Sequence, residues 1–389
     1  MTVQHGDRRM GLRLSAYYFA YFSFLGAFSS YYGVYLQGLG LSAWRISVVI
    51  SLIQVMRIVA PTGWGWLAER LGRRAALVKV SAAACLPVFA VFFAVDSFAA
   101  LAAVTAVLGF FWSASLPLVE AITLRHLQAT PERYGRIRVW GSVGYIAAVL
   151  ATGAMLDLLP LRALLWIAMC LLAVLCAAAF TLAEPRAQER HVGAAALGTT
   201  LARREVRAVL LAAFCMSFAH APYYVFFSIH LVDHGYAKTI VGSLWALAVI
   251  AEVGVFLWMP RILGAWSLRA IFLATFAAAA IRFALIGWGV ELLPLLIAAQ
   301  LLHAVTFGAF HGAAVAALNR WFAGRHQARV QALYGSISFG AGGLSGGLLA
   351  GQAWDLAGPS LTFSGAAAAA LLGGLAIWRN VAADEGARR

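Results

Sequence analysis

The feature that most limits the fold of this chain is a series of apolar stretches, each long enough to cross a lipid bilayer. A membrane-spanning helix needs about 20 apolar residues. Inside hydrocarbon every backbone N–H and C=O group must be paired, which a helix achieves within itself. We therefore expect an all-α integral membrane protein with twelve transmembrane helices. Their predicted ranges are 12–37, 44–68, 75–95, 98–124, 138–158, 163–183, 206–232, 239–262, 270–289, 293–318, 328–353 and 360–379.

The composition agrees with a surface that faces lipid. Of the 389 residues, 63% are apolar and 11% are charged, whereas a soluble globular chain carries roughly 45–50% apolar and 25% charged residues. A net charge of +14 would suggest nucleic-acid binding in a soluble protein. Here the basic residues lie between apolar stretches, so we expect the lipid bilayer as a partner and no nucleic acid.

The longest polar joint divides the chain into halves. It runs from Glu184 to Arg207, after six predicted spans and before six. We predict an N-terminal six-helix bundle at 1–183, a cytoplasmic linker at 184–205 and a C-terminal six-helix bundle at 206–389. Two pseudo-symmetric bundles are a common transporter design, which holds the substrate near the membrane midplane.

A weak internal repeat supports this symmetry. A shift of 195 residues places Gly40 on Gly235 and Arg57 on Glu252. Arg57 and Glu252 would then occupy equivalent places with opposite charge and could pair across a central cavity. The sequence does not show whether they touch.

Lysine and arginine predict the orientation, because positively charged loops remain on the cytoplasmic side. If the N-terminus is inside, 24 of the 29 lysine and arginine residues lie in cytoplasmic termini, loops or helix ends. Three, namely Arg45, Arg162 and Lys238, lie outside. We expect a multi-pass protein of the cell inner membrane, a monomer with both termini in the cytoplasm.

Six ionisable side chains lie inside the apolar stretches, where an unpaired charge costs at least about 2.5–3.5 kcal/mol. Such side chains usually face a bundle interior or a water-filled path and serve it. A polar central site is thus predicted, and transport is the function that such a site favours. The six are Arg57, Glu120, Glu252, Arg282, His303 and His311.

The first half contributes an arginine, an amide and an acid. Gln54 and Arg57 share a helix face, and a planar guanidinium suits bidentate binding of a carboxylate. A structural role for Arg57, as partner of an intramembrane acid, is equally open. Glu120 follows Pro117, which removes one backbone donor from its helix. Glu120 either pairs with a cation or carries a proton.

The second half contributes the predicted protonation site. Glu252 lies deep in an apolar span, and His303 is its expected titrating neighbour, since an unperturbed histidine has a pKa near ~6.5. Two helix faces combine histidine with aromatic residues and are expected to line a cavity. One face holds His220, Tyr223 and Tyr224, and the other holds His303, Phe307, Phe310 and His311.

The joint between spans 2 and 3 resembles a known signature. It reads Gly65-Trp-Leu-Ala-Glu69-Arg70-Leu-Gly72-Arg73-Arg74 and is similar to the cytoplasmic motif of the major facilitator superfamily, with Glu69 where Asp is usual. Gly65 is expected to permit close helix approach, and Gly72 to take a positive φ in the turn. The resemblance implies a major facilitator fold in which Glu69 pairs with an arginine and contacts a helix of the other half. A basic loop held inside is the plainer interpretation.

Three further segments resemble the phenylpropionate permease family, which imports 3-phenylpropionate-type acids with protons. They lie at 134–144, at 219–253 and around His303 to His311. Arg57, Arg282 and Glu120 fall where that family has an arginine, an arginine and an acid, which is typically Asp. From these positions and the residue patterns above, we predict proton coupling through Glu120, Glu252 and His303. The predicted substrate-binding residues are Gln54, Arg57, His220, Tyr223, Tyr224, Arg282, Phe307 and His311. The placing of Glu120, Glu252, Arg282 and His303 also resembles the lactose-permease branch of proton–sugar symporters.

Other chemistries have little support in the sequence. The four cysteines form no CxxC pair, His303 and His311 are too far apart for a compact metal site, and no P-loop motif is present. We predict no metal, no cofactor other than a proton gradient as driving force, and no enzyme activity.

The function predicted is import of a small organic acid, preferably an aromatic carboxylate, by proton symport with alternating access. A proton-coupled sugar, oligosaccharide or nucleoside symporter is the alternative. A non-transporting membrane sensor on the same fold is the alternative from another class.

Overall fold

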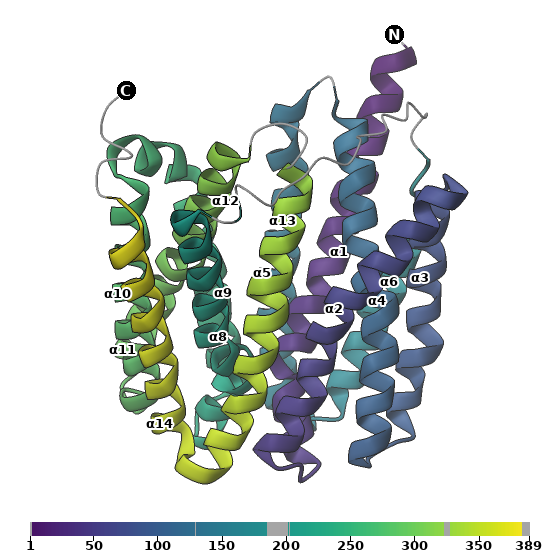
Figure 1. Cartoon of the computed structure of the whole chain (residues 1–389). Helices are drawn as coiled ribbons and strands as arrows, with labels where there is room; N and C mark the ends of the chain where they lie inside the picture. Colours follow the sequence, from purple (N-terminus) through teal and green to yellow (C-terminus); the bar gives the residue numbers. More distant parts are fainter. Residues whose placement is uncertain (1, 129, 185–200, 202, 323–326, 383–389) are drawn as a thin grey trace. The chain divides into compact units, whose positions relative to one another are not determined.

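The structure is a computed structural model, which describes residues 2–128, 130–184, 201, 203–322 and 327–382. Every regular element in these ranges is a helix, so the all-α prediction is confirmed (Figure 1). The first half contains α1 Thr2–Gly38, α2 Ala43–Leu71, α3 Arg74–Ala90, η1 Val91–Phe93, α4 Phe98–His126, η2 Pro131–Arg133, α5 Tyr134–Leu158 and α6 Ala163–Phe180. The second contains α8 Arg204–Asp233, α9 Lys238–Ala265, α10 Leu268–Trp288, α11 Leu293–His303, η3 Ala304–Ala309, α12 Phe310–Trp321, α13 Gln327–Gly335, η5 Ser336–Gly342 and α14 Gly343–Asn380.

Ten of the described helical segments are long and apolar enough to cross a membrane, where the sequence predicted twelve. The difference has two physical causes. The helix α1 covers the first predicted span, but its serines and tyrosines lower its mean hydropathy. The segment Val330–Asn380 counts once although it contains two predicted spans, because the chain reverses at Gly358, whose φ of 81° is left-handed (Figure 1).

The described residues form two compact units. The first comprises α1 to α6 together with Tyr236–Ala246. In it α1 packs on α5 and α6, α2 packs on α4, and α3 packs on α4 and α6. Glycine permits the close approach of α1 to α5, since a Cβ at Gly26 would lie 2.6 Å from the carbonyl oxygen of Tyr145.

The second unit comprises α8, the part of α9 from Leu247 onward, and α10 to α14. The helix α8 packs on α14 and η5, and α10 packs on α14, α11 and η3. Small residues again set the helix separation. A Cβ at Gly342 or Gly346 would lie 2.6 or 2.5 Å from the carbonyl oxygen of Phe214 or Phe218 on α8. The predicted linker, 184–205, falls mainly outside the described residues and remains a prediction.

Two turns of π-helix interrupt the helices of the second unit. They are η3, which directly follows His303, and η5. Single π turns are rare and occur frequently at functional sites, because the extra residue per turn changes which side chains share a face. The turn η3 carries Thr306 and Phe307 into the region of the predicted site.

The signature joint between α2 and α3 is partly as predicted. Gly72 ends α2 with a φ of 63°, and its N–H donates to the carbonyl oxygen of Ala68 over 3.0 Å. A Cβ at Gly65 would meet no described atom within 4 Å, and the close helix approach expected there stays a prediction. The buried face of this part of α2 is formed by Ala60, Trp64 and Ala68, and Gly65 is turned about 100° away from Trp64.

Two carboxylates in the first unit bind the first backbone N–H groups of a helix. The carboxylate of Glu184 accepts hydrogen bonds from Arg74 N, at 2.9 Å, and from Ala75 N, at 2.7 Å, at the start of α3. The carboxylate of Asp157 accepts from Lys238 N, at 2.7 Å, and from Thr239 N, at 2.9 Å, at the start of α9. Negative charge at a helix N-terminus satisfies free donors and complements the helix dipole.

Candidate functional site

The second unit contains a buried arginine, and some of its N–H donors have no hydrogen-bond partner among the described residues. Arg282, on α10, is completely buried, and its Nε donates to the carbonyl oxygen of Ala299 over 3.0 Å. Its Cζ lies 4.1 Å from the ring centroid of Tyr223 and 5.2 Å from that of Phe283. Among the described residues, Nη1 and Nη2 have no hydrogen-bond partner. A buried cation with free donors is costly, so an anion arriving here would be stabilised.

Glu252 meets His303 near this arginine, since the ring of Tyr223, on which Arg282 lies, has its centroid 5.6 Å from that of His303. The Oε2 atom of Glu252, on α9, lies 3.8 Å from Nε2 of His303, the last residue of α11. The backbone of η3 runs against α9 at this point, since a Cβ at Gly308 would lie 3.4 Å from Cγ of Glu252. The pair is an ion pair only when His303 is protonated, so one proton changes the charge of this contact.

Hydrogen bonds fix the residues around the pair. His220 Nδ1 is bonded to Met216 O at 2.8 Å, and its Nε2 is bonded to Thr306 Oγ1 at 3.2 Å. The Tyr223 hydroxyl donates to Gln300 Oε1 over 2.8 Å. Nε2 of Gln300 and Nδ1 of His303 are buried without a partner among the described residues. The cluster therefore offers unpaired nitrogen atoms from three side chains, those of Arg282, Gln300 and His303, and those of Arg282 and Gln300 are donors.

The sequence analysis missed Gln300. Its signal was available, because Gln300 is a polar residue in an apolar span, three positions before His303 and therefore on the same helical face.

The two predicted aromatic faces come together in part. The ring centroid of His303 lies 5.6 Å from that of Tyr223 and 5.5 Å from that of Phe307. Phe307 continues the row to His311 over 6.3 Å. Tyr223 is buried, whereas Tyr224 is exposed.

Phe310 does not belong to its predicted face. It packs into the core, with its ring centroid 5.5 Å from those of Phe272 and Phe276 on α10. The prediction assumed an uninterrupted α-helix, whereas the π turn η3 ends immediately before Phe310.

The first unit presents a second arginine in a different setting. Arg57, on α2, is exposed, and its Nη1 donates to Gln54 Oε1 over 3.1 Å. Its Cζ lies 5.3 Å from the ring centroid of Trp112 on α4. The sequence analysis did not select Trp112, because a tryptophan in an apolar span carries no charge to mark it.

Glu120 interacts electrostatically with an arginine of α5, Arg138. The Cζ atom of Arg138 lies 4.1 Å from the ring centroid of Phe22 and 5.5 Å from that of Tyr18. Arg138 was noticed only as part of the segment 134–144. The acid itself was the signal, since an intramembrane carboxylate usually has a cation near it.

The remaining predicted site residues stay predictions. In the signature joint Glu69, Arg70 and Arg73 are exposed, and Arg70 Cζ lies 5.4 Å from the ring centroid of Trp66. Arg57 and Glu252 lie in different units. Within the described part of the chain no group of three histidine, cysteine, aspartate or glutamate residues could hold a metal ion.

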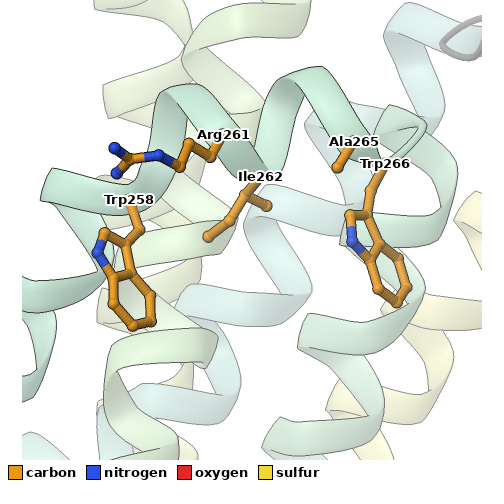
Figure 2. Close-up of a pocket in the computed structure, with 5 residues that line it drawn as sticks. All are labelled: Trp258, Arg261, Ile262, Ala265 and Trp266. Carbon is orange, nitrogen blue, oxygen red and sulfur yellow. The ribbon is translucent and has the colours of Figure 1, made fainter.

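A groove on α9 contains none of the predicted site residues. Figure 2 shows the indoles of Trp258 and Trp266 on either side of Ile262, with Arg261 and Ala265 nearby. Four of the five residues lie in the last turns of α9, Trp266 directly follows its end, and both tryptophans are exposed. Exposed tryptophan next to arginine is typical of a surface at the membrane–water interface.

Buried charges inside apolar helices are typical of membrane transport proteins, and a comparison with protein families identifies such a family. The model of the MFS_1 like family matches residues 11–365. The chain belongs to this family. It is therefore a transporter of the major facilitator superfamily, a multi-pass membrane protein that moves a small molecule by secondary transport, and not an enzyme.

The chain is similar to several characterised or named transporters. It is 29% identical over 337 residues to the probable 3-phenylpropionic acid transporter of Escherichia coli (strain K12), covering 83% of this chain and 86% of that protein. It is 28% identical over 270 residues to a maltose permease of Geobacillus stearothermophilus, covering 68% of each.

Among solved structures, the nucleoside transporter NupG (D323A mutant) matches with a TM-score of 0.84 at 17% identity, covering 96% of this chain and all of that one. A peptide transporter of the POT family matches with a TM-score of 0.70 at 13% identity, covering 98% of this chain and 99% of that one. At these identities the likeness shows the fold, which is the major facilitator fold.

Proposed function

We propose that this transporter is a proton symporter that imports a small aromatic carboxylate. The observation that carries the proposal is the contact of Glu252 with His303 next to the buried guanidinium of Arg282. A carboxylate that takes up and releases a proton beside a fixed cation changes between a neutral and a charged form. Each form favours a different set of partners, and a proton can therefore drive a conformational change.

Burial separates the roles of the two intramembrane arginines. Arg282 is completely buried and lies over the rings of Tyr223 and Phe283, so it suits an internal anion such as ionised Glu252. Arg57 is exposed, and only one of its terminal nitrogens is bonded to Gln54. Arg57 therefore suits the carboxylate of an incoming substrate, and Gln54 holds it in place.

Aromatic side chains near both arginines favour a substrate with an aromatic ring. His220, Tyr223, Phe307 and His311 provide stacked ring surfaces in the second unit. Rings prefer offset-stacked or edge-to-face neighbours. The similarity to a probable 3-phenylpropionic acid transporter points to the same class of substrate. We take 3-phenylpropionate as the preferred test compound.

A sugar or nucleoside symporter is the second candidate. The charge of Arg138 acts on Glu120, Tyr18 lies close to Arg138, and a carboxylate near a guanidinium can bind several hydroxyl groups. The similarity to a maltose permease supports this reading. A sensor without transport, the candidate from another class, would show no saturable flux for any compound.

The proposal includes a specific membrane arrangement. It has twelve crossings in two pseudo-symmetric bundles, with α1 as the first crossing and Gly358 as the turn between the last two. It places the protein in the cell inner membrane as a monomer, with both termini in the cytoplasm, and the halves alternate in giving access to the site.

Uptake into proteoliposomes tests the proposed function. Labelled 3-phenylpropionate is supplied with and without an imposed inward proton gradient, and unlabelled maltose and uridine are added as competitors. The proposal predicts saturable uptake that exceeds equilibrium only with the gradient, and no competition. In parallel assays, gradient-driven uptake of labelled maltose or uridine would move the assignment to the second candidate. No saturable uptake of any of the three compounds by folded protein would favour the sensor.

A further inference from the structure

The first unit holds a stack of side chains formed by Tyr21, Trp112 and Arg57. The indole of Trp112 lies parallel to the ring of Tyr21, with centroids 4.8 Å apart and an interplanar angle of 4°. The guanidinium carbon of Arg57 lies 5.3 Å from the centroid of Trp112. Phe24 closes one side, with its ring 6.0 Å from that of Trp112 at 60°. The stack joins α1, α4 and α2.

Local sequence explains why the arginine reaches this ring. A Cβ at Gly109 would lie 3.2 Å from Cβ of Met56, so α2 and α4 are close at this level. Arg57 follows Met56, and Trp112 lies one helical turn after Gly109. The glycine therefore brings the guanidinium over the indole.

The stack leaves the guanidinium ready for an anion. A guanidinium that lies over an aromatic ring contacts the ring with its own flat face, so the N–H groups at the guanidinium edge can still donate hydrogen bonds. Trp112 is 4% exposed, and its Nε1 has no hydrogen-bond partner among the described residues. The indole is therefore held by packing, and the exposed guanidinium edge of Arg57 is the group that can meet an anion.

We propose that Trp112 is a positioning residue for substrate recognition, which holds the Arg57 guanidinium face-on so that its edge receives the substrate carboxylate. This inference rests on the proposed function, in which Arg57 binds that carboxylate. In this arrangement the carboxylate subsite is the edge of the Arg57 guanidinium, and Tyr21 supports the Trp112 indole by stacking on it.

Chemical labelling tests the stack without any transport. Phenylglyoxal modifies arginine, and mass spectrometry of the peptide that contains Arg57 gives the rate of its modification. We expect the rate to rise in Trp112→Leu by roughly two- to thirtyfold, the range that a lost cation–π contact allows, and to rise less in Trp112→Phe, which keeps an aromatic face. Trp64→Leu is the matched control, because Trp64 is also buried, at 7% exposure, and packs on Phe110 and Phe111.

Ligand protection and transport test the subsite itself. In the wild type, 3-phenylpropionate and 3-cyclohexylpropionate should slow the modification of Arg57, and the neutral 3-phenylpropanamide should not. In Trp112→Leu the KM for 3-phenylpropionate should rise by roughly two- to thirtyfold while the maximal rate changes little. Trp112→Phe should restore much of the affinity, and Trp64→Leu should keep the wild-type KM.

Two results would overturn the proposal. One is an Arg57 labelling rate that is the same in the wild type and Trp112→Leu, which would mean that the indole does not hold the guanidinium. The other is an equal effect of Trp64→Leu and Trp112→Leu, which would mean a general loss of packing. If wild-type protein takes up no 3-phenylpropionate, the proposed function fails, whereas labelling and its protection by carboxylates still decide the role of Trp112.

Discussion

At the residue scale, the proposed proton coupling depends on the titratable contact between Glu252 and His303. The two side chains come from helices that are far apart in the sequence, and the contact lies beside a buried arginine whose outer nitrogens are unpaired among the described residues. We expect Glu252 to stabilise the nearby arginine more strongly when it is ionised than when it is protonated. Its protonation state is therefore expected to control the cluster.

The variant Glu252→Gln keeps the size of the side chain and removes its proton chemistry. We expect gradient-driven accumulation of 3-phenylpropionate to be lost, while exchange of labelled for unlabelled substrate across the membrane continues, since exchange needs no net proton movement. Uptake and counterflow are measured on the same proteoliposomes. The surface variant Glu132→Gln is the control, and accumulation that persists in Glu252→Gln would remove Glu252 from proton coupling.

The variant Arg57→Lys keeps the positive charge and removes the bidentate fork. We expect the KM for 3-phenylpropionate to rise by roughly tenfold, which corresponds to the loss of about one charge-assisted hydrogen bond. Initial rates over a range of substrate concentrations measure it. An unchanged KM would show that the carboxylate binds elsewhere.

At the scale of the helices, two carboxylates act as caps over long sequence distances. Glu184 binds the N-terminus of α3, and Asp157 binds that of α9. Asp157 also accepts from the Thr239 hydroxyl over 2.6 Å. The contact is reinforced by Tyr31, whose hydroxyl lies 3.0 Å from the carbonyl oxygen of Lys238. The start of α9 is thereby fixed within the first unit.

Removal of the Asp157 cap should destabilise the protein measurably. We expect Asp157→Ala to lower the free energy of unfolding by about 1–2 kcal/mol, the upper part of the usual range for a side-chain cap. The melting temperature in detergent reports the loss. Asp157→Asn should lower the free energy of unfolding less, because the amide oxygen of asparagine still accepts a hydrogen bond. Asp96 is exposed, and Asp96→Asn is the control. An equal loss of stability in Asp96→Asn would contradict a specific capping role for Asp157.

Hydropathy predicts the helices of this chain well, and their interruptions poorly. Apolar runs mark each span because lipid sets their length. The π turn η3 and the reversal at Gly358 are decided by single residues and by tertiary packing, which an average over about 20 residues conceals. The candidate site follows the same rule. Glu252, His303 and Arg282 are visible as charges in apolar runs, whereas Gln300 and Trp112 become visible only through their contacts.

At the scale of the whole molecule, charge distribution predicts how the chain is threaded through the membrane. Alkaline phosphatase is active only on the outer side of the inner membrane. Fused after Arg73 it should be inactive, and fused after Leu161 it should be active. A fluorescent protein at the C-terminus should fluoresce. The opposite pattern would invert the proposed topology and with it the side from which the substrate enters.

If substrate and proton move together, the addition of substrate must change the external pH. Wild-type protein in weakly buffered proteoliposomes, without an imposed gradient, receives 3-phenylpropionate. We expect a rise in external pH that saturates with substrate and is absent in Glu252→Gln. Saturable uptake of 3-phenylpropionate without any change in external pH would contradict proton symport.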